Sequence, residues 1–242
     1  MLRIGLLTSG GDCQALNATM RGVVKGLANN VKDLEVYGFM NGYKGLIYSD
    51  YRMLSAKDFS GILTQGGTIL GTSRQPFKLM RVPDENGLDK VELMKHTYYK
   101  LKLDALVVLG GNGSQKTANL LSQEGLNVIG LPKTIDNDLF GTDHCPGFGS
   151  AARYIATTCM EVQRDTHVYD NGTITVLEIM GRHAGWLAGS AALAAWVGYG
   201  PDLIYLPEVD FDMERFLADV HQVYQAKNKC LIAVSEGIHR AD

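Results

Sequence analysis

The sequence lacks the long apolar runs of a membrane protein and the paired cysteines of a disulfide-rich secreted one. No run approaches the roughly 20 apolar residues that a transmembrane helix needs. The N-terminus, MLRIGLLTSGG, has no long apolar stretch ending in a cleavage site, and it predicts a first strand rather than a signal peptide. The four cysteines are scattered, without a C-x-x-C pair, which is typical of free thiols in a reducing compartment. We therefore expect a cytoplasmic protein with no membrane partner.

The sequence also has little net charge, and two common nucleotide-binding motifs are missing. The formal charge is −3 over 242 residues, so no broad positive field for nucleic-acid binding is expected. Neither the Walker A motif G-x-x-x-x-G-K-[ST] nor the dinucleotide fingerprint G-x-G-x-x-G occurs, and the second absence disfavours a dinucleotide-binding dehydrogenase. An anionic ligand would have to be held by individual arginines, lysines and backbone amides.

Short apolar runs alternate with helix-like segments along the chain. The expected strands lie at residues 3–9, 34–39, 104–110, 127–132, 173–180, 202–208 and 230–237. The expected helices lie at residues 14–30, 114–125, 148–169, 183–198 and 213–227. Apolar strands separated by helices indicate an α/β fold with mainly parallel sheets covered on both faces.

Two segments depart from this alternation. The polar stretch RQPFKLMRVPDENGLDK, residues 74–90, predicts a loop. The chain ends at Asp242, soon after a predicted strand that would normally lead into a helix, so we expect the given chain to be a piece of a longer polypeptide.

Ligands of open parallel sheets bind outside the carboxyl ends of the strands. The segments in that position are SGGDCQALN (9–17), GGNGS (110–114), PKTIDND (132–138), MGRHAG (180–185) and EG (236–237). A separate glycine-rich loop, QGGTILGTSR (65–74), ends in Arg74. Glycine pairs let the backbone turn sharply and approach a ligand closely, and a helix that begins at about Ser114, with Ser114 as its N-cap, would direct free amides at a phosphate. One glycine pair alone would indicate a plain turn; several on one edge favour anion binding.

The PKTIDND loop is suited to activating a hydroxyl group. A carboxylate can accept a proton from a substrate alcohol, and Lys133 would keep that carboxylate ionised and neutralise a transferring phosphoryl group. The second carboxylate could serve Mg²⁺. An isolated Asp-Asn-Asp would instead indicate a turn whose side chains bond to the local backbone. Beside the glycine loops, the functional interpretation is preferred.

In this order, the motifs TSGGD, GGTILGTSR, GGNGS, PKTIDND, MGRHAGW, LPE and SEG resemble the phosphofructokinase family over essentially the whole chain. The resemblance implies two Rossmann-like α/β lobes, the second incomplete here, with residues 1–138 binding the phosphoryl donor and residues 139–242 binding fructose 6-phosphate. The implied reaction, a step of glycolysis, transfers a phosphoryl group to the 1-hydroxyl of fructose 6-phosphate and gives fructose 1,6-bisphosphate. An allosteric homo-oligomer, a dimer or tetramer, is also implied.

The resemblance assigns a role to each matching residue. The implied catalytic group is Asp136, the base, with Thr134, Arg74 and Lys133. The residues implied to bind the donor are Gly10, Gly11, Arg74, Gln75, Gly111, Asn112, Gly113 and Ser114. Those implied to bind the sugar phosphate are Thr134, Ile135, Asp136, Met180, Gly181, Arg182 and Glu236. The implied cofactor is Mg²⁺, served by Asn112 and Asp138.

The donor implied by the resemblance depends on two positions. In the pyrophosphate-using branch the position of Gly113 usually holds an aspartate, which obstructs the nucleotide, so Gly113 resembles the ATP-using enzymes. Lys133 resembles the pyrophosphate branch, since many ATP-using enzymes have glycine there. An aspartate at position 113 would repel and displace the ATP α-phosphate, so we predict ATP and keep pyrophosphate as the alternative.

Three positions depart from the family pattern. Asn112 replaces an aspartate that usually serves Mg²⁺, Thr173 replaces an arginine that often reaches a neighbouring subunit, and the usual Pro-Gly after GGD is absent. Arg153 and Arg164 are the candidates for the role of the missing arginine. These departures motivate a second hypothesis, a catalytically weakened regulatory homologue that binds sugar phosphate or nucleotide.

Overall fold

The structure, a computed structural model, describes residues 1–11, 13–84 and 86–241, and divides into two units, Met1–Thr134 and Ile135–Asp242. Each unit is an α/β layer structure with its own sheet. The predicted fold class, α/β with mainly parallel sheets, is confirmed. The sequence prediction divides the chain after Asp138, whereas the two compact units meet between Thr134 and Ile135.

The first unit contains a five-stranded sheet in the order β3-β2-β1-β4-β5. Its strands are β1 (Leu2–Ser9), β2 (Leu34–Phe39), β3 (Tyr51–Leu54), β4 (Ala105–Gly110) and β5 (Val128–Pro132). Neighbouring strands are parallel except for β3, which runs antiparallel to β2. The interior strand β4, ALVVLG, is buried along its whole length, as expected for an apolar strand covered on both faces.

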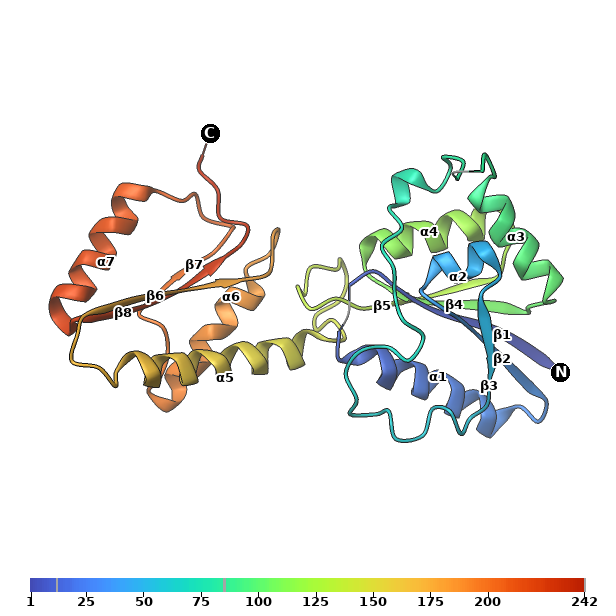
Figure 1. Ribbon diagram of the computed structural model, residues 1–242, viewed down its shortest axis with the longest axis horizontal. Helices are drawn as coiled ribbons and strands as arrows, with labels where there is room; N and C mark the ends of the chain where they lie inside the picture. The colour runs from blue at the N-terminus through green and yellow to red at the C-terminus, as the bar shows by residue number, and fades with distance from the viewer. Residues whose placement is uncertain (12, 85, 242) are drawn as a thin grey trace. The chain divides into compact units, whose positions relative to one another are not determined.

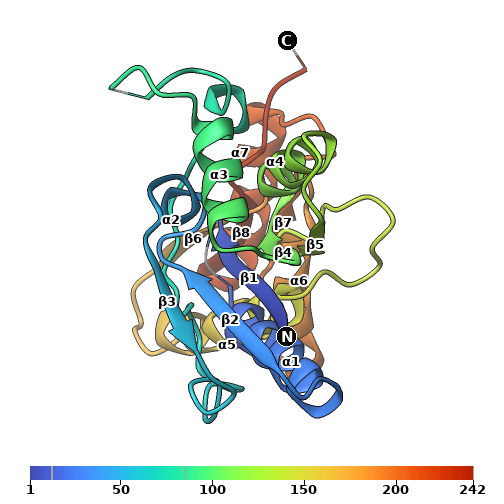
Figure 2. The ribbon, with the colours of Figure 1, turned by 90° about the vertical axis from the view of Figure 1, so that its right-hand side faces the viewer.

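Helices cover both faces of this sheet. They are α1 (Ala15–Asn30), α2 (Tyr43–Tyr48), α3 (Lys90–Lys100) and α4 (Asn112–Gln123), with a short 3₁₀ helix η1 (Phe77–Leu79) inside the predicted loop 74–90. Figure 2 shows α1 on one face and α2, α3 and α4 on the other. The core beneath α2, α3 and α4 joins their buried apolar residues to those of the central strands.

The second unit contains a three-stranded parallel sheet in the order β6-β8-β7. Its elements are α5 (Phe148–Thr166), β6 (Thr173–Ile179), α6 (Trp186–Ser190), the 3₁₀ helix η2 (Ala191–Val197), β7 (Leu203–Tyr205), α7 (Met213–Lys227) and β8 (Lys229–Ser235). Helices α5 and α6 lie on one face, and α7 lies on the other, where it packs against β7 and β8.

Strand β6 departs from the predicted burial on both faces. Within the described residues it is an edge strand that pairs with β8, and its exposure alternates along the strand. Leu177 and Ile179 pack against the core under α5, whereas Ile174 and Val176 are 52% and 53% exposed. The described helix α7 covers β7 and β8 and leaves the corresponding face of β6 open.

Candidate active site

Three of the predicted loops lie side by side at one edge of the first sheet. Strands β1, β4 and β5 are parallel neighbours, and their last residues are in register, Ser9 opposite Gly110 and Gly110 opposite Pro132. The loops that follow them, which begin at Gly10, Gly111 and Lys133, therefore start from adjacent positions. The structure thus brings together the starts of three loops that the sequence analysis predicted to lie at one edge, as the rule for parallel sheets requires.

Helix α4 begins two residues earlier than predicted, and Ser114 is not its N-cap. The helix starts at Asn112 with Gly111 as N-cap, and no side chain caps it. Ser114 is 8% exposed and packs so closely on Gly110 that a Cβ at Gly110 would lie 2.3 Å from the Ser114 Cβ. The buried Tyr43 hydroxyl donates to the Ser114 carbonyl at 2.8 Å. This packing places Ser114 within the first helical turn rather than before it. Burial also raises the pKa of the Tyr43 hydroxyl.

The first turn of α4 presents amides in the manner of an anion site. The Gln115 amide bonds to the Gly111 carbonyl at 3.0 Å, so the amides of Asn112, Gly113 and Ser114 precede the first helical bond and have no partner within the helix. Asn112 and Gly113 are exposed. Apart from its two chain neighbours and the backbone of its own helix, no described heavy atom lies within 4 Å of an ideal Cβ built on Gly113. The turn can therefore receive a phosphate, and a side chain at position 113 would extend into the same open space.

Lys133 links the loop after β5 to the loop after β1. The residue is 7% exposed, its backbone amide donates to the Gly110 carbonyl at 3.1 Å, and its ammonium group donates to the Gly11 carbonyl. A buried positive charge therefore lies directly against the glycine loop. Its proposed effect on a transferring phosphoryl group stays a prediction.

The arginine-bearing loop 65–74 has almost no regular secondary structure, and buried polar side chains fix its path. Asn17, on α1 and fully buried, donates to the carbonyls of Gln65 at 3.1 Å and Gly66 at 3.3 Å, and accepts from the Ile69 amide at 2.9 Å. The buried Thr8 hydroxyl donates to the Gly71 carbonyl at 2.9 Å. These bonds fix the backbone between Gln65 and Gly71, and Arg74, three residues further on, is exposed.

The PKTIDND loop crosses the boundary between the units. Thr134 ends the first unit, and Ile135 packs against the apolar core of the second. Asp136 is half-buried and Asp138 is exposed. Their assigned roles stay predictions.

Asn137 is a structural residue of this loop that the role assignment did not include. It has φ +58°, is 8% exposed, donates to the Asp143 carbonyl at 3.2 Å and accepts from the Cys145 amide at 2.8 Å. Asn137 therefore ties the backbone at Asp143 and Cys145 to the turn between the two carboxylates. The signal was available in the sequence, since asparagine tolerates the left-handed conformation better than most residues.

The predicted sugar-phosphate residues that follow β6 and β8 are also neighbours. Ile179 and Ser235 are in register, and the Glu236 amide donates to the Ile179 carbonyl at 2.8 Å. The buried Ser235 hydroxyl donates to the Gly181 carbonyl at 2.7 Å. Gly181 has φ +119°, a conformation that requires glycine.

Within the second unit these bonds fix the backbone from which four predicted residues project. Met180, Arg182 and Glu236 are exposed, and Gly181 forms the turn between the first two. A Cβ on Gly237 would lie 2.0 Å from the Arg182 carbonyl, so the segments after β6 and β8 approach each other as closely as backbones can. The guanidinium of Arg182 and the carboxylate of Glu236 can both meet a polar ligand at this edge.

Glu208 is a second residue to which the sequence assigned no role. Its carboxylate accepts from the Gly185 amide at 2.7 Å, just before α6 begins at Trp186. The carboxylate therefore holds the start of this short helix, and with it the end of the MGRHAG segment. The motif LPE, which follows β7, was the available signal.

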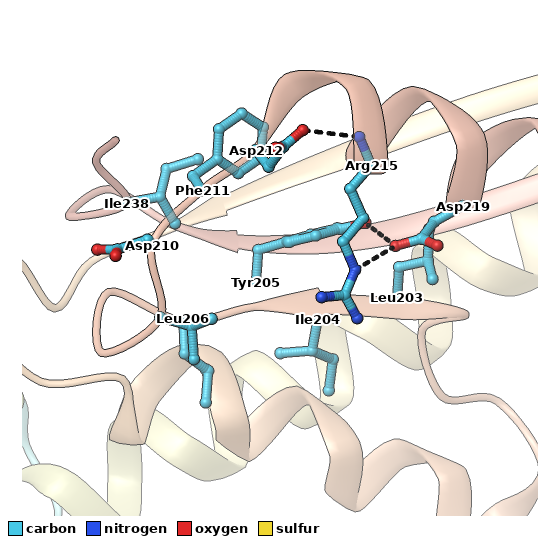
Figure 3. A pocket seen from close by; sticks show the side chains of 11 residues that line it. Leu203, Ile204, Tyr205, Leu206, Asp210, Phe211, Asp212, Arg215, Asp219 and Ile238 are labelled. Atoms are coloured by element: carbon cyan, nitrogen blue, oxygen red, sulfur yellow. Dashed lines mark hydrogen bonds and ion pairs between the residues drawn. The ribbon is translucent and has the colours of Figure 1, made fainter. Parts of the chain in front are cut away.

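A well-formed cavity lies elsewhere, along β7 (Figure 3). It has a volume of about 260 Å³ and is lined by Tyr205, Phe211, Arg215 and Asp219 among others, none of them a predicted site residue. The Tyr205 hydroxyl donates to Asp219 at 3.1 Å, and burial together with Asp219 raises the pKa of Tyr205 to about 12. Its lining has three carboxylates, those of Asp210, Asp212 and Asp219, against the one arginine, Arg215, so it is unsuited to phosphates and we do not place the active site there.

The residues predicted to serve a metal are oxygen donors. Asn112 and Asp138 are both exposed. Among the described residues, no group of three or more histidine, cysteine, aspartate or glutamate side chains could hold a metal ion. Each side chain offers the kind of oxygen that suits Mg²⁺, an ion that keeps several waters and is bound largely through substrate phosphates. In residues 1–11, 13–84 and 86–241, no helix is both long and apolar enough to cross a bilayer.

Comparison with known proteins gives consistent matches. The family model Phosphofructokinase matches residues 3–242. The chain is 48% identical over 241 residues to ATP-dependent 6-phosphofructokinase of Spirochaeta thermophila, covering 96% of this chain and 63% of that protein. It is 44% identical to the enzyme of the same name from Propionibacterium freudenreichii subsp. shermanii, with 98% and 61% covered. The chain therefore spans less than two thirds of the length of these two relatives.

Pyrophosphate-dependent proteins match as well. The chain is 39% identical to pyrophosphate–fructose 6-phosphate 1-phosphotransferase of Amycolatopsis methanolica, covering 98% of this chain and 65% of that protein. Among solved structures, the pyrophosphate-dependent phosphofructokinase of Nitrosospira multiformis has a TM-score of 0.85 at 27% identity, with 99% of this chain and 62% of that one covered. Pichia pastoris phosphofructokinase in the T-state has a TM-score of 0.82 at 27% identity, with 99% and 26% covered.

Proposed function

Because this chain belongs to the phosphofructokinase family, we propose that the protein is a 6-phosphofructokinase, a phosphotransferase with an alcohol acceptor. It transfers a phosphoryl group from ATP to the 1-hydroxyl of fructose 6-phosphate and forms fructose 1,6-bisphosphate. The observation that carries the proposal is the edge of the first sheet, where the glycine loop after β1, the uncapped first turn of α4 and the buried Lys133 lie together. Amides and one buried cation suit a chain of phosphates.

Different parts of the chain bind the phosphoryl donor and the sugar phosphate. Residues 1–138 bind the donor through Gly10, Gly11 and the segment 111–114, together with Arg74 at the end of the loop 65–74 and Gln75 directly after it. Residues 139–242 bind fructose 6-phosphate through the backbone of Met180 and Gly181 and the side chains of Arg182 and Glu236. The register of β6 and β8 supports this set, because it holds the segments after both strands together.

The chemical step depends on the loop that joins the units. Asp136 accepts the proton of the sugar 1-hydroxyl, and Thr134 and Ile135 contact the transferring group or the sugar. Arg74 and Lys133 offset the charge of the moving phosphoryl group, because most of the catalysis of phosphoryl transfer comes from positioning and electrostatics. Bound Mg²⁺ would neutralise charge on the donor phosphates, with Asn112 and Asp138 as the residues that serve it.

ATP is the proposed donor because of Gly113. The open space around its Cα leaves room for a nucleotide at the first turn of α4, where an aspartate would place a carboxylate. The relatives named above as ATP-dependent are 48% and 44% identical to the chain, and the one named for pyrophosphate is 39% identical. Pyrophosphate remains the alternative donor, and Lys133 favours it.

Incubation of the full-length protein with fructose 6-phosphate and Mg²⁺, with ATP or with pyrophosphate, tests the proposal. We expect fructose 1,6-bisphosphate with ATP. Product with pyrophosphate alone would overturn the choice of donor. Product with neither donor would reject the enzyme, and retained binding of ATP or fructose 6-phosphate in a calorimeter would then favour the weakened regulatory homologue suggested by Asn112 and Thr173.

The cellular setting follows from the family resemblance. We place the reaction in cytoplasmic glycolysis and expect an allosteric homo-oligomer, a dimer or tetramer. Light scattering of the full-length protein gives the oligomeric state, and a monomer at assay concentration would contradict this expectation.

A further inference from the structure

One hydroxyl group joins two of the proposed donor loops. The Thr72 hydroxyl, in the loop 65–74, donates to the Gly10 carbonyl at 2.6 Å, across 62 residues of sequence. Gly10 has φ +90°, so the chain turns sharply at the acceptor of this bond. Thr72 lies two residues before Arg74. It is half-buried, and neither the motifs nor the family resemblance assigned it a role.

The bond fixes the direction of a backbone amide. In a trans peptide the C=O and the following N–H point in opposite directions, and no cis peptide bond occurs among the described residues. When Thr72 holds the Gly10 carbonyl, the Gly11 amide is directed away from Thr72. Lys133 holds the next carbonyl, that of Gly11. Side chains from two other loops therefore set the orientation of this glycine pair, which could otherwise rotate freely.

Thr72 can act as a fixed point because the chain before it is anchored. The Thr8 hydroxyl is 2.8 Å from the Thr68 hydroxyl and donates to the Gly71 carbonyl at 2.9 Å. Asn17 binds residues 65, 66 and 69 from the core side. Beyond Thr72, the Ser73 hydroxyl donates to the Asn41 carbonyl at 2.6 Å. The last contacts before Arg74 are therefore made by residues 72 and 73.

We propose that Thr72 is a positioning residue for phosphoryl transfer. Its hydroxyl holds the Gly10–Gly11 peptide and the base of Arg74 in one arrangement, so that the amide and the guanidinium address the same donor phosphates. The proposal rests on the function proposed above, since it gives Thr72 a purpose only if those loops bind a phosphoryl donor.

Valine and serine variants test the proposal. Thr72→Val keeps the shape of the side chain and removes the hydroxyl, and Thr72→Ser keeps the hydroxyl. Loss of one such hydrogen bond predicts a fall in kcat/KM for the donor of about five- to tenfold for Thr72→Val. The KM for fructose 6-phosphate should stay within about twofold of the parent value, because the residues assigned to the sugar phosphate are elsewhere. Thr72→Ser should recover most of the lost activity.

Thr19→Val is the matched control. The Thr19 hydroxyl donates to the Ala15 carbonyl within α1 at 2.8 Å, so this variant loses the same kind of bond outside the donor loops. Thermal denaturation of both variants shows whether their stability changes equally. If Thr72→Val matches Thr19→Val in its donor kinetics, or if serine fails to restore activity, Thr72 has no positioning role.

Binding measurements separate this proposal from the proposed function. If the parent forms product with neither ATP nor pyrophosphate, the proposed function fails, and titration calorimetry with Mg²⁺–ATP and with pyrophosphate still decides about Thr72. Weaker binding by Thr72→Val than by Thr19→Val supports the positioning role. Equal affinities, or a parent that binds neither compound, overturn it.

Discussion

At the scale of single residues, Asp136 is the residue that we propose as the base of the reaction. Asp136→Asn keeps the size of the side chain and removes its capacity as a base. We expect kcat to fall by about 10²–10⁴-fold while fructose 6-phosphate still binds, since general-base catalysis contributes about that much. Steady-state kinetics and calorimetry measure the two quantities. Asp143→Asn, at an exposed position in the same connecting segment, is the control. Undiminished turnover in the Asp136 variant would reject Asp136 as the base.

Gly113 gives a sharper test of the donor. Gly113→Asp adds a Cβ that meets no described atom within 4 Å beyond its chain neighbours and its own helix backbone. An acidic residue in a first helical turn is favourable for the helix. The fold should therefore tolerate the change. We expect kcat/KM for ATP to fall by about tenfold or more, because a carboxylate beside the donor phosphates costs at least about 1.4 kcal/mol of binding.

The matched control for this variant is Gly149→Asp. Gly149 holds the same second position of α5 that Gly113 holds in α4, and it too has open space around its Cα. The control should leave ATP kinetics unchanged. ATP kinetics that are equally unaffected in both variants would remove the main argument for ATP.

Residue positions that follow from the end of a strand could be predicted, and contacts between distant segments could not. Gly10, Gly111 and Lys133 follow strands in sequence, so their common edge was expected from the rule for parallel sheets. Thr72 and Glu208 act through bonds to Gly10 and Gly185, 62 and 23 residues away. Nothing in a single sequence shows which distant carbonyl or amide such a side chain reaches.

At the scale of secondary structure, three elements of the first unit were not predicted from the sequence: helix α2, strand β3 and helix α3. Helix α2 has six residues, and the strand β3 that follows it has four. A helix that short has little stability of its own and depends on tertiary packing, here the burial of Tyr43 and Leu46. The early start of α4 has a similar cause, because the packing of Ser114 against Gly110 outweighs the preference of serine for the N-cap.

One ion-pair cluster ties the end of α4 to α3 and predicts a pH dependence. Glu124, the C-cap of α4, accepts from Arg81 at 2.7 Å and from Lys95 of α3 at 3.3 Å. The hydrogen bond from Arg81, and then that from Lys95, lowers the pKa of Glu124 below its ordinary value of 4.5. The folded state therefore favours the ionised carboxylate, and this contribution to stability is present above the unfolded pKa and is lost as pH falls through the folded pKa.

Glu124→Gln should thus be less stable than the parent at pH 7, and the difference should shrink as pH falls below the ordinary glutamate pKa. Urea denaturation across this pH range measures it. Glu161→Gln, at an exposed position of α5, corrects for general effects of removing one acidic group. A difference that persists unchanged at low pH would mean that charge is not what Glu124 contributes.

At the scale of the whole molecule, the α/β class and the mainly parallel sheets followed from the alternation of apolar strands and helices. The boundary between the two units was harder to predict from the sequence. Ile135 belongs to the apolar core of the second unit, and this depends on packing that its own sequence neighbourhood does not reveal. Whether the donor-binding half ends at Asp138, as the resemblance implies, stays a prediction.

The edge position of β6 has a consequence for the aggregation of the 242-residue chain. A long edge strand with apolar side chains is a template on which other chains can add strands. The exposed Ile174 and Val176 give β6 that character. We expect the average mass of the chain, measured by light scattering, to rise with concentration beyond the mass of a dimer or tetramer. Val176→Lys should suppress the rise, whereas Leu217→Lys, at a 58% exposed position on helix α7, should not.

A concentration-independent mass for the parent, or equal suppression by both variants, would contradict this expectation. If it is met, recovery of the unaggregated chain will depend on protecting one strand edge during expression and storage. A single charged side chain on β6 would then be a practical gatekeeper against aggregation.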